Sequence, residues 1–318
     1  MTWPACGPEA DRDSPGAKPP PEALPQLLPR LGRDGSFSLY SRGRGCEEGF
    51  HSAAGALREA NEKFVVPAAL ERFAPGRELV VAEVAVGTGT NTAALLAAAT
   101  AAGLELDWWG LELDPRPLAL ALADAGFRAQ WPEAVLSRLE GLAGGDRLWL
   151  GDARRRLPEL LDILAGHCDL VLLDAFSPPR CPQLWSREFL EQLVRLLRPD
   201  GRLLTYSSAA AVRRCLLELG LELRAIRPPA DKPERWSAGT AAGFTPLAPH
   251  PALRPLEPFE REHLASRAGL PYRDPSGTAT AAEILERRRR EQERSDAPPA
   301  RLPRRPGPGG LGRPEGHR

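Results

Sequence analysis

Residues 79–91, LVVAEVAVGTGTN, join a buried-strand pattern to a glycine turn and then to an Ala/Leu-rich helix, which restricts how this chain can fold. The run 79–86 is apolar except for Glu83, as expected of a parallel strand covered on both faces. Gly87 and Gly89 permit a tight turn and a close approach of the backbone to a ligand. The segment therefore predicts an α/β fold with a ligand site at this turn.

The turn leads into a predicted helix over residues 91–100, opened by Asn91, whose first N–H groups face the same ligand. The short form G-x-G, without a third glycine, argues against a dinucleotide pyrophosphate. It favours a smaller, cationic adenosyl cofactor such as S-adenosylmethionine. A strand, glycine turn and helix also occur in α/β proteins that bind nothing there, so this alternative stays open.

Three further apolar segments end close to an acidic residue: residues 107–113 at Glu112, residues 148–150 before Asp152, and residues 169–173 before Asp174. Glu112 lies where a carboxylate can accept both ribose hydroxyls, and Asp152 where one can hold the adenine amino group. Because ligands collect at the carboxyl ends of strands in open α/β sheets, these acids predict one site. Each acid alone could instead cap a helix or open a turn.

A length of 318 residues allows one domain of ordinary size plus tails. The alternation of strand-like and helix-like segments predicts a doubly wound, mostly parallel sheet. A hairpin-like segment is expected near residues 36–40, a helix over 55–72, strands over 202–206 and 221–227, and a helix over 209–219. The expected parts are a Pro-rich disordered segment 1–30, an N-terminal extension 31–75, a central domain 76–245, a C-terminal extension 246–294 and a disordered basic tail 295–318.

The sequence shows no apolar run long enough for a membrane span and no secretory signal pattern, which predicts a cytoplasmic protein. Five cysteines without C-x-x-C spacing predict neither a disulfide framework nor a zinc site, and no other metal is expected. Formal net charge is zero, but ten arginines face five acidic residues between Glu286 and Arg318. This basic end either adds affinity for nucleic acid phosphates or forms a solvated helix end followed by a disordered terminus.

Four blocks of the sequence resemble the methyltransferase domain of the tRNA 5-methylaminomethyl-2-thiouridine-forming (MnmC-like) enzymes. The blocks are residues 34–59, 83–91, 148–153 and 173–207. The most specific one begins Leu173-Asp174-Ala175-Phe176-Ser177-Pro178. With later matching segments, the resemblance covers residues 34–294, which is most of the chain.

The resemblance implies a Rossmann-like class I S-adenosylmethionine-dependent methyltransferase with an N-terminal hairpin and helix extension. It implies methyl transfer to the aminomethyl group of wobble 5-aminomethyl-(2-thio)uridine in the anticodon loop of tRNA, without an obligate protein partner. Asp174 is expected to be catalytic, by orienting the amine or taking its proton. The expected cofactor-binding residues are Glu83, Gly87, Gly89, Asn91, Glu112, Asp152 and Asp174, and the expected substrate-binding residues are Tyr40, His51, Phe176, Pro178, Arg180 and Trp185.

The sequence departs from the family pattern at several places. Ala85 replaces a usual glycine, Arg180-Cys181 replaces a common Lys-Asn, and a Lys-Arg-Glu-Met segment is missing around residues 231–240. No second G-x-G-x-x-G stands between a strand-like and a helix-like segment, so flavin is not expected to bind. Three alternatives stay open: a small-molecule amine transferase of the spermidine synthase-like type, a non-catalytic protein of methyltransferase fold, and a tRNA-binding scaffold dominated by the basic tail.

Overall fold

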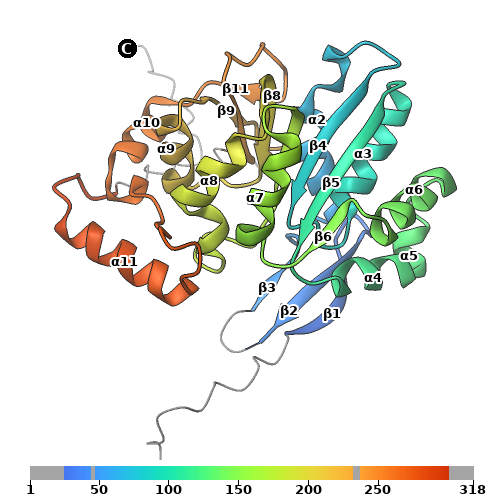
Figure 1. The fold of residues 1–318 in the computed structure, drawn as a ribbon, viewed down its shortest axis with the longest axis horizontal. Helices are drawn as coiled ribbons and strands as arrows, with labels where there is room; N and C mark the ends of the chain where they lie inside the picture. The colour runs from blue at the N-terminus through green and yellow to red at the C-terminus, as the bar shows by residue number, and fades with distance from the viewer. Residues whose placement is uncertain (1–24, 44–46, 232–236, 301–318) are drawn as a thin grey trace, which may run out of the picture.

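The computed structural model describes residues 25–43, 47–231 and 237–300, and within them a central sheet of eight strands runs in the order β11-β9-β10-β8-β7-β4-β5-β6 (Figure 1). The strands are β4 (Glu78–Val84), β5 (Glu105–Glu112), β6 (Leu148–Leu150), β7 (Cys168–Leu173), β8 (Leu197–Thr205), β9 (Glu222–Ile226), β10 (Gly239–Gly243) and β11 (Leu253–Arg254). The five strands from β8 to β6 are parallel, whereas β10 pairs antiparallel with both β8 and β9. The predicted doubly wound, mostly parallel sheet is confirmed.

Helices cover both faces of this sheet. Because successive strand side chains point to opposite faces, Val81 of β4 joins one apolar core and Ala82 joins the other. The first core includes side chains of α3 (Thr90–Ala101) and α6 (Glu133–Gly144), and the second includes side chains of α7 (Ala153–Leu164), α8 (Arg187–Val194) and α9 (Ala210–Glu218). The short helices α4 (Arg116–Ala123) and α5 (Ala125–Arg128) follow β5.

The N-terminal extension forms a small antiparallel sheet of β1 (Gln26–Leu31), β2 (Phe37–Arg42) and β3 (Glu48–Gly49). Since β1 begins at Gln26, the expected disordered segment cannot reach residue 30, and residues 1–24 lie outside the described part. The single helix expected over 55–72 is wrong in detail. It is divided into α1 (Ala56–Ala60), a π-helical turn η1 (Asn61–Val65), α2 (Val66–Ala68) and a 3₁₀ turn η2 (Leu70–Arg72). Ala69 adopts a left-handed φ of 52°, which ends α2.

The C-terminal extension belongs to the same body as the central sheet. Its strand β11 pairs with β9, so a domain boundary at residue 245 would cut through the sheet. Beyond β11 come α10 (Pro258–Ala265), the 3₁₀ turn η4 (Arg267–Gly269) and α11 (Ala281–Arg294), which lie beside α8, α9 and the 3₁₀ turn η3 (Pro182–Trp185) (Figure 1). A buried ion pair of 2.7 Å between Arg213 of α9 and Glu260 of α10 holds the extension against α9.

The arginine run 287–290 lies within α11 and is largely paired. Arg288 donates to the carbonyls of Ala268 and Leu270, and Arg289 and Arg290 pair with Glu286. These contacts favour the solvated helix end over a free phosphate-binding tail. The chain stays ordered past residue 294, because Arg267 donates to the carbonyls of 297 and 298. The rest of the basic tail, 301–318, lies outside the described residues.

Across the ranges that the structure describes, no helix combines the length and apolar character needed to cross a membrane.

Candidate active site

A cavity of about 1770 Å³ lies at the carboxyl ends of β4, β5, β6 and β7, with the N-terminal extension forming part of its wall. Eight of the predicted site residues line it: His51, Gly87, Asn91, Glu112, Asp152, Asp174, Phe176 and Arg180. They come from segments that are far apart in sequence. The parallel topology brings them together, because the strands deliver their carboxyl ends to one edge of the sheet.

The turn after β4 is shaped by three residues with positive φ, namely Ala85, Gly87 and Gly89. The backbone N–H of Gly87 faces the end of β5 and donates to Glu112 Oε2 at 2.8 Å. A Cβ at Gly87 would lie 3.3 Å from the ring of Phe50, so a side chain here would crowd the cavity wall. The positive φ therefore favours glycine at this position, and a Cβ there would also require the Phe50 ring to shift by a few tenths of an ångström.

Glu112 is held in one orientation by three backbone donors. Its Oε1 accepts from the N–H groups of Leu113 and Asp114, and its Oε2 accepts from Gly87. Burial raises the pKa of Glu112, and these three hydrogen bonds oppose that rise. A carboxylate offers about four acceptor positions, so roughly one remains for a ligand hydroxyl.

Asp174 follows β7 and lies opposite the first turn of α3. Asn91 Nδ2 donates to Asp174 Oδ2 at 2.7 Å. Burial raises the pKa of Asp174 to about 7, although the hydrogen bond from Asn91 opposes part of this rise. Near neutral pH, Asp174 can therefore accept or return a proton, as an acid/base group does.

Two residues that were not predicted as site residues, Glu59 and Lys63, form an ion pair of 3.0 Å in the cavity wall. Lys63 belongs to the π-helical turn η1, and its ammonium lies 5.5 Å from the ring centre of Tyr206. Tyr206, also in the wall, donates its hydroxyl to the carbonyl of Ala175. Glu59 ends the first block of the family resemblance, but for Lys63 the sequence offered no more than its i,i+4 spacing from Glu59, which is typical of exposed helix pairs.

An aromatic wall stands beside Asp174. The rings of Phe50 and Phe176 meet edge to face at 5.1 Å, and the Arg180 guanidinium lies 4.0 Å from the Phe176 ring centre. Arg180 also donates to Ser41 Oγ at 2.8 Å, which ties this wall to the N-terminal sheet. Such a surface can stack a planar base.

His51 lines the same side of the cavity. Its Nδ1 lies 2.9 Å from Ser38 Oγ, and burial lowers its pKa to about 4. The imidazole is therefore neutral near pH 7, and its hydrogen bond to Ser38 suits a positioning role.

Five of the predicted site residues do not line the cavity: Tyr40, Glu83, Gly89, Pro178 and Trp185. Glu83 points into the core, where Thr92 Oγ1 and Trp108 Nε1 both donate to its Oε2. Gly89 serves packing, because a Cβ there would lie 2.6 Å from Leu118 Cδ1.

The other three are held elsewhere by local contacts. Trp185 is 1% exposed, packs in the apolar core and donates its indole N–H to the carbonyl of Phe176. Tyr40 points outward and donates to Glu47 at 3.2 Å. Pro178 is buried in the loop after β7. Trp185 and Pro178 therefore shape the loop that presents Phe176, and the expected stacking role of Trp185 is corrected.

Glu83 makes protein stability depend on pH. Burial raises its pKa from the usual 4.5 to about 7, so the folded state holds this proton more tightly than the unfolded state. This contribution is full below pH 4.5 and is lost as pH rises to about 7. We expect Glu83→Gln to remove this pH-dependent contribution. From pH 4 to pH 8 the unfolding free energy of the variant should therefore rise by about 3 kcal/mol relative to that of the wild type. Urea unfolding across this range measures it, and a constant difference would contradict the assignment.

Ala85 occupies a backbone conformation that favours glycine, with φ at 64°. A glycine would adopt this φ without the strain that a Cβ introduces. We expect Ala85→Gly to raise the unfolding free energy by about 0.5–1 kcal/mol, because relief of the left-handed strain exceeds the entropy cost of glycine. Denaturant unfolding tests it. The matched control Ala98→Gly, inside α3, should lose about 1 kcal/mol, and an equal loss in both variants would exclude the strain.

Cofactor fit follows from the donor set. The cavity has carboxylates at the ends of β5 and β7, a glycine turn without a side chain and an apolar wall. These groups fit a nucleoside carrying a cationic sulfur. Within the described residues, no group of three His, Cys, Asp or Glu side chains is placed to hold a metal ion.

Comparison with known proteins defines the class of this fold and site. A family model described as S-adenosyl-L-methionine-dependent methyltransferase matches residues 121–240. The crystal structure of MnmC2 from Aquifex aeolicus superposes with a TM-score of 0.70 at 29% sequence identity, covering 86% of this chain and 87% of that one. The chain is an S-adenosylmethionine-dependent methyltransferase with a Rossmann-like fold.

Sequence relatives narrow the class. The tRNA 5-methylaminomethyl-2-thiouridine biosynthesis bifunctional protein MnmC of Pseudomonas entomophila is 33% identical over 240 residues, which are 68% of this chain and 35% of that protein. An uncharacterised protein of Methanocaldococcus jannaschii is 28% identical over 275 residues, which are 82% of this chain and 71% of that protein. The chain carries a methyltransferase domain of the MnmC-like family, and it spans about a third of the length of the bifunctional relatives.

Proposed function

We propose that this enzyme methylates the aminomethyl group of wobble 5-aminomethyl-(2-thio)uridine in tRNA and acts in the cytoplasm. The observation that carries the proposal is that Asp174, bonded to Asn91 after the glycine turn, lines the same cavity as the Phe50–Phe176–Arg180 wall. Relatives named for 5-methylaminomethyl-2-thiouridine biosynthesis support the same substrate. The partner is tRNA, and neither a flavin nor a metal is needed for this step.

In this proposal, Gly87, Asn91, Glu112 and Asp152 hold S-adenosylmethionine, which supplies an electrophilic methyl group when it is bound. The lone pair of the primary amine would take this methyl group, the electrons of the broken carbon–sulfur bond would stay on the sulfur, and the nitrogen would lose one proton. Asp174 accepts a hydrogen bond from the amine and then its proton. Phe176 and Arg180 stack the splayed uracil, so the protein acts mainly by positioning.

A direct test supplies purified protein with labelled S-adenosylmethionine and tRNA carrying either 5-aminomethyl-2-thiouridine or its carboxymethylaminomethyl form. Digestion and mass spectrometry should show 5-methylaminomethyl-2-thiouridine from the first tRNA only. The second should stay unchanged, because methyl transfer cannot remove a carboxymethyl group. Label on putrescine or spermidine, with none on aminomethyl tRNA, would overturn the proposal in favour of a small-molecule amine substrate.

A further inference from the structure

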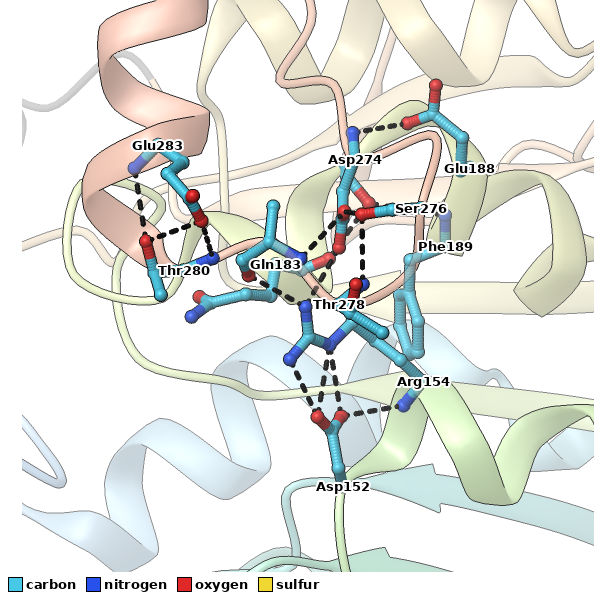
Figure 2. A network of polar contacts seen from close by, with 12 residues as sticks. Asp152, Arg154, Gln183, Glu188, Phe189, Asp274, Ser276, Thr278, Thr280 and Glu283 are labelled. Carbon is cyan, nitrogen blue, oxygen red and sulfur yellow. Dashed lines mark hydrogen bonds and ion pairs between the residues drawn. The ribbon is translucent and has the colours of Figure 1, made fainter. Parts of the chain in front are cut away.

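One arginine in the cavity wall connects the N-terminus of α7 to the C-terminal extension. Arg154 Nη2 donates to Asp152 Oδ2 at 2.7 Å, and its Nε lies 3.1 Å from both oxygens of Asp152. Its Nη1 points the other way and donates to Asp274 Oδ2 at 2.8 Å and to the carbonyl of Ala279 at 2.9 Å (Figure 2). Arg154 therefore joins two carboxylates that lie 122 positions apart in the numbering of the chain.

The segment that holds Arg154 is itself fixed. The side chain of Asp274 is 1% exposed, and its Oδ1 accepts from Ala279 N at 3.1 Å and Ser276 Oγ at 3.0 Å. Its backbone N–H donates to Glu188 Oε2 of α8 at 2.7 Å (Figure 2). Asp274 thus provides a fixed point for the guanidinium.

Exposure decreases along this chain of contacts. The Asp152 side chain is 31% exposed and lines the cavity, that of Arg154 is 14% exposed, and that of Asp274 is 1% exposed. Asp152 also accepts from the backbone N–H of Arg154 at its Oδ1, which caps α7. Three N–H groups of Arg154 thus bond the two oxygens of Asp152, so about one of the four acceptor positions of this carboxylate remains for a ligand.

We propose that Arg154 is a positioning residue for the cofactor, which holds the Asp152 carboxylate where it can accept the adenine amino group and is itself held by Asp274 of the C-terminal extension. The bidentate pair fixes the orientation of Asp152 before the cofactor binds. Cofactor binding therefore does not bear the entropy cost of ordering this side chain. Loss of Asp274 leaves Arg154 Nη1 with only the neutral carbonyl of Ala279, so the guanidinium and the Asp152 carboxylate are held less firmly. The C-terminal extension thereby determines recognition of the adenine end of the cofactor. This inference rests on the proposed cofactor site.

The test compares two ligands by calorimetry: S-adenosylhomocysteine, and its analogue in which hydrogen replaces the purine 6-amino group. The variants are Asp274→Asn, which breaks the pair with Arg154, and Arg154→Lys, which keeps the charge but cannot span both carboxylates. The matched control is Glu283→Gln, because Glu283 lies in the same extension and bonds Thr280 rather than Arg154 (Figure 2). Melting temperatures show that each variant is folded.

Wild type and Glu283→Gln should bind S-adenosylhomocysteine about 10-fold more tightly than the analogue, as expected for a hydrogen bond to a charged group. In Asp274→Asn and Arg154→Lys this ratio should fall to about 1–2, since the oriented acceptor is lost. In an Asp152→Asn background, Asp274→Asn should have no further effect on the ratio. A general loss of stability would weaken both ligands equally and leave the ratio unchanged.

A folded Asp274→Asn or Arg154→Lys variant that keeps the wild-type ratio would overturn the inference, and so would a wild type that does not distinguish the ligands. If Asp274→Asn does not fold, Arg154→Lys decides alone. Failure of the wild type to bind S-adenosylhomocysteine at all would instead overturn the proposed cofactor site, and the inference with it.

Discussion

Asp174→Asn is expected to bind S-adenosylhomocysteine as the wild type does and to lose methyl transfer by about 10²-fold or more, the usual scale for a positioned acid/base group. An amide has nearly the same shape but cannot take a proton from the attacking amine. It can also keep the contact with Asn91, which now donates to Asp174 at 2.7 Å. Single-turnover rates with aminomethyl tRNA, measured beside cofactor binding, separate chemistry from binding.

The pH profile provides a second measurement for Asp174. Because burial raises its pKa to about 7, its basic form predominates only above that pH, and the wild-type rate should rise through pH 7. In Asp174→Asn the limb due to this group should disappear. The control Asp146→Asn changes a side chain that is 97% exposed and should keep both rate and profile. Wild-type activity in Asp174→Asn would reduce Asp174 to a residue that opens a turn.

The strand ends were predictable because they follow a local pattern. An apolar run followed by glycine or an acid places that residue at the carboxyl edge of a parallel sheet, wherever the strand itself begins. Thus Glu112, Asp152 and Asp174 all line the cavity at this edge, even though β5 begins at Glu105 rather than at residue 107. Residues within a strand were harder, since Glu83 shares the motif of the site yet faces the core.

The contacts that were not predicted join segments distant in sequence or depend on irregular backbone. The π-helical turn that contains Lys63 leaves no local signature, because an ordinary helix would have the same composition. The pairing of Arg154 with Asp274 depends on how the C-terminal extension packs beside α8 and η3. One sequence read alone contains no pattern that connects those two positions. Hydrophobic periodicity predicts the helices and strands and the faces that they bury. The polar contacts between these elements depend on how they pack in the folded chain.

Gly87→Val is expected to weaken S-adenosylhomocysteine binding by about 100-fold, because the turn that faces the cofactor would have to move. Gly87 has a φ of 58°, where a β-branched residue is strongly disfavoured, and its Cβ would lie 3.3 Å from Phe50. A shift of this turn also breaks the bond from Gly87 N to Glu112 Oε2. A bond to a charged group contributes about 1.5–3 kcal/mol, which corresponds to about 10- to 100-fold in affinity.

The control for Gly87→Val is Gly76→Val, which separates backbone strain from loss of the site. Gly76 has a φ of 84°, and a Cβ there would meet no atom within 4 Å. Both variants should lose stability through the strained backbone, but only Gly87→Val should lose the ligand. Calorimetry with S-adenosylhomocysteine, combined with denaturant unfolding, measures the two effects separately. Equal affinity in Gly87→Val and wild type would show that the cofactor does not approach this turn. The proposed cofactor position in the cavity would then be wrong.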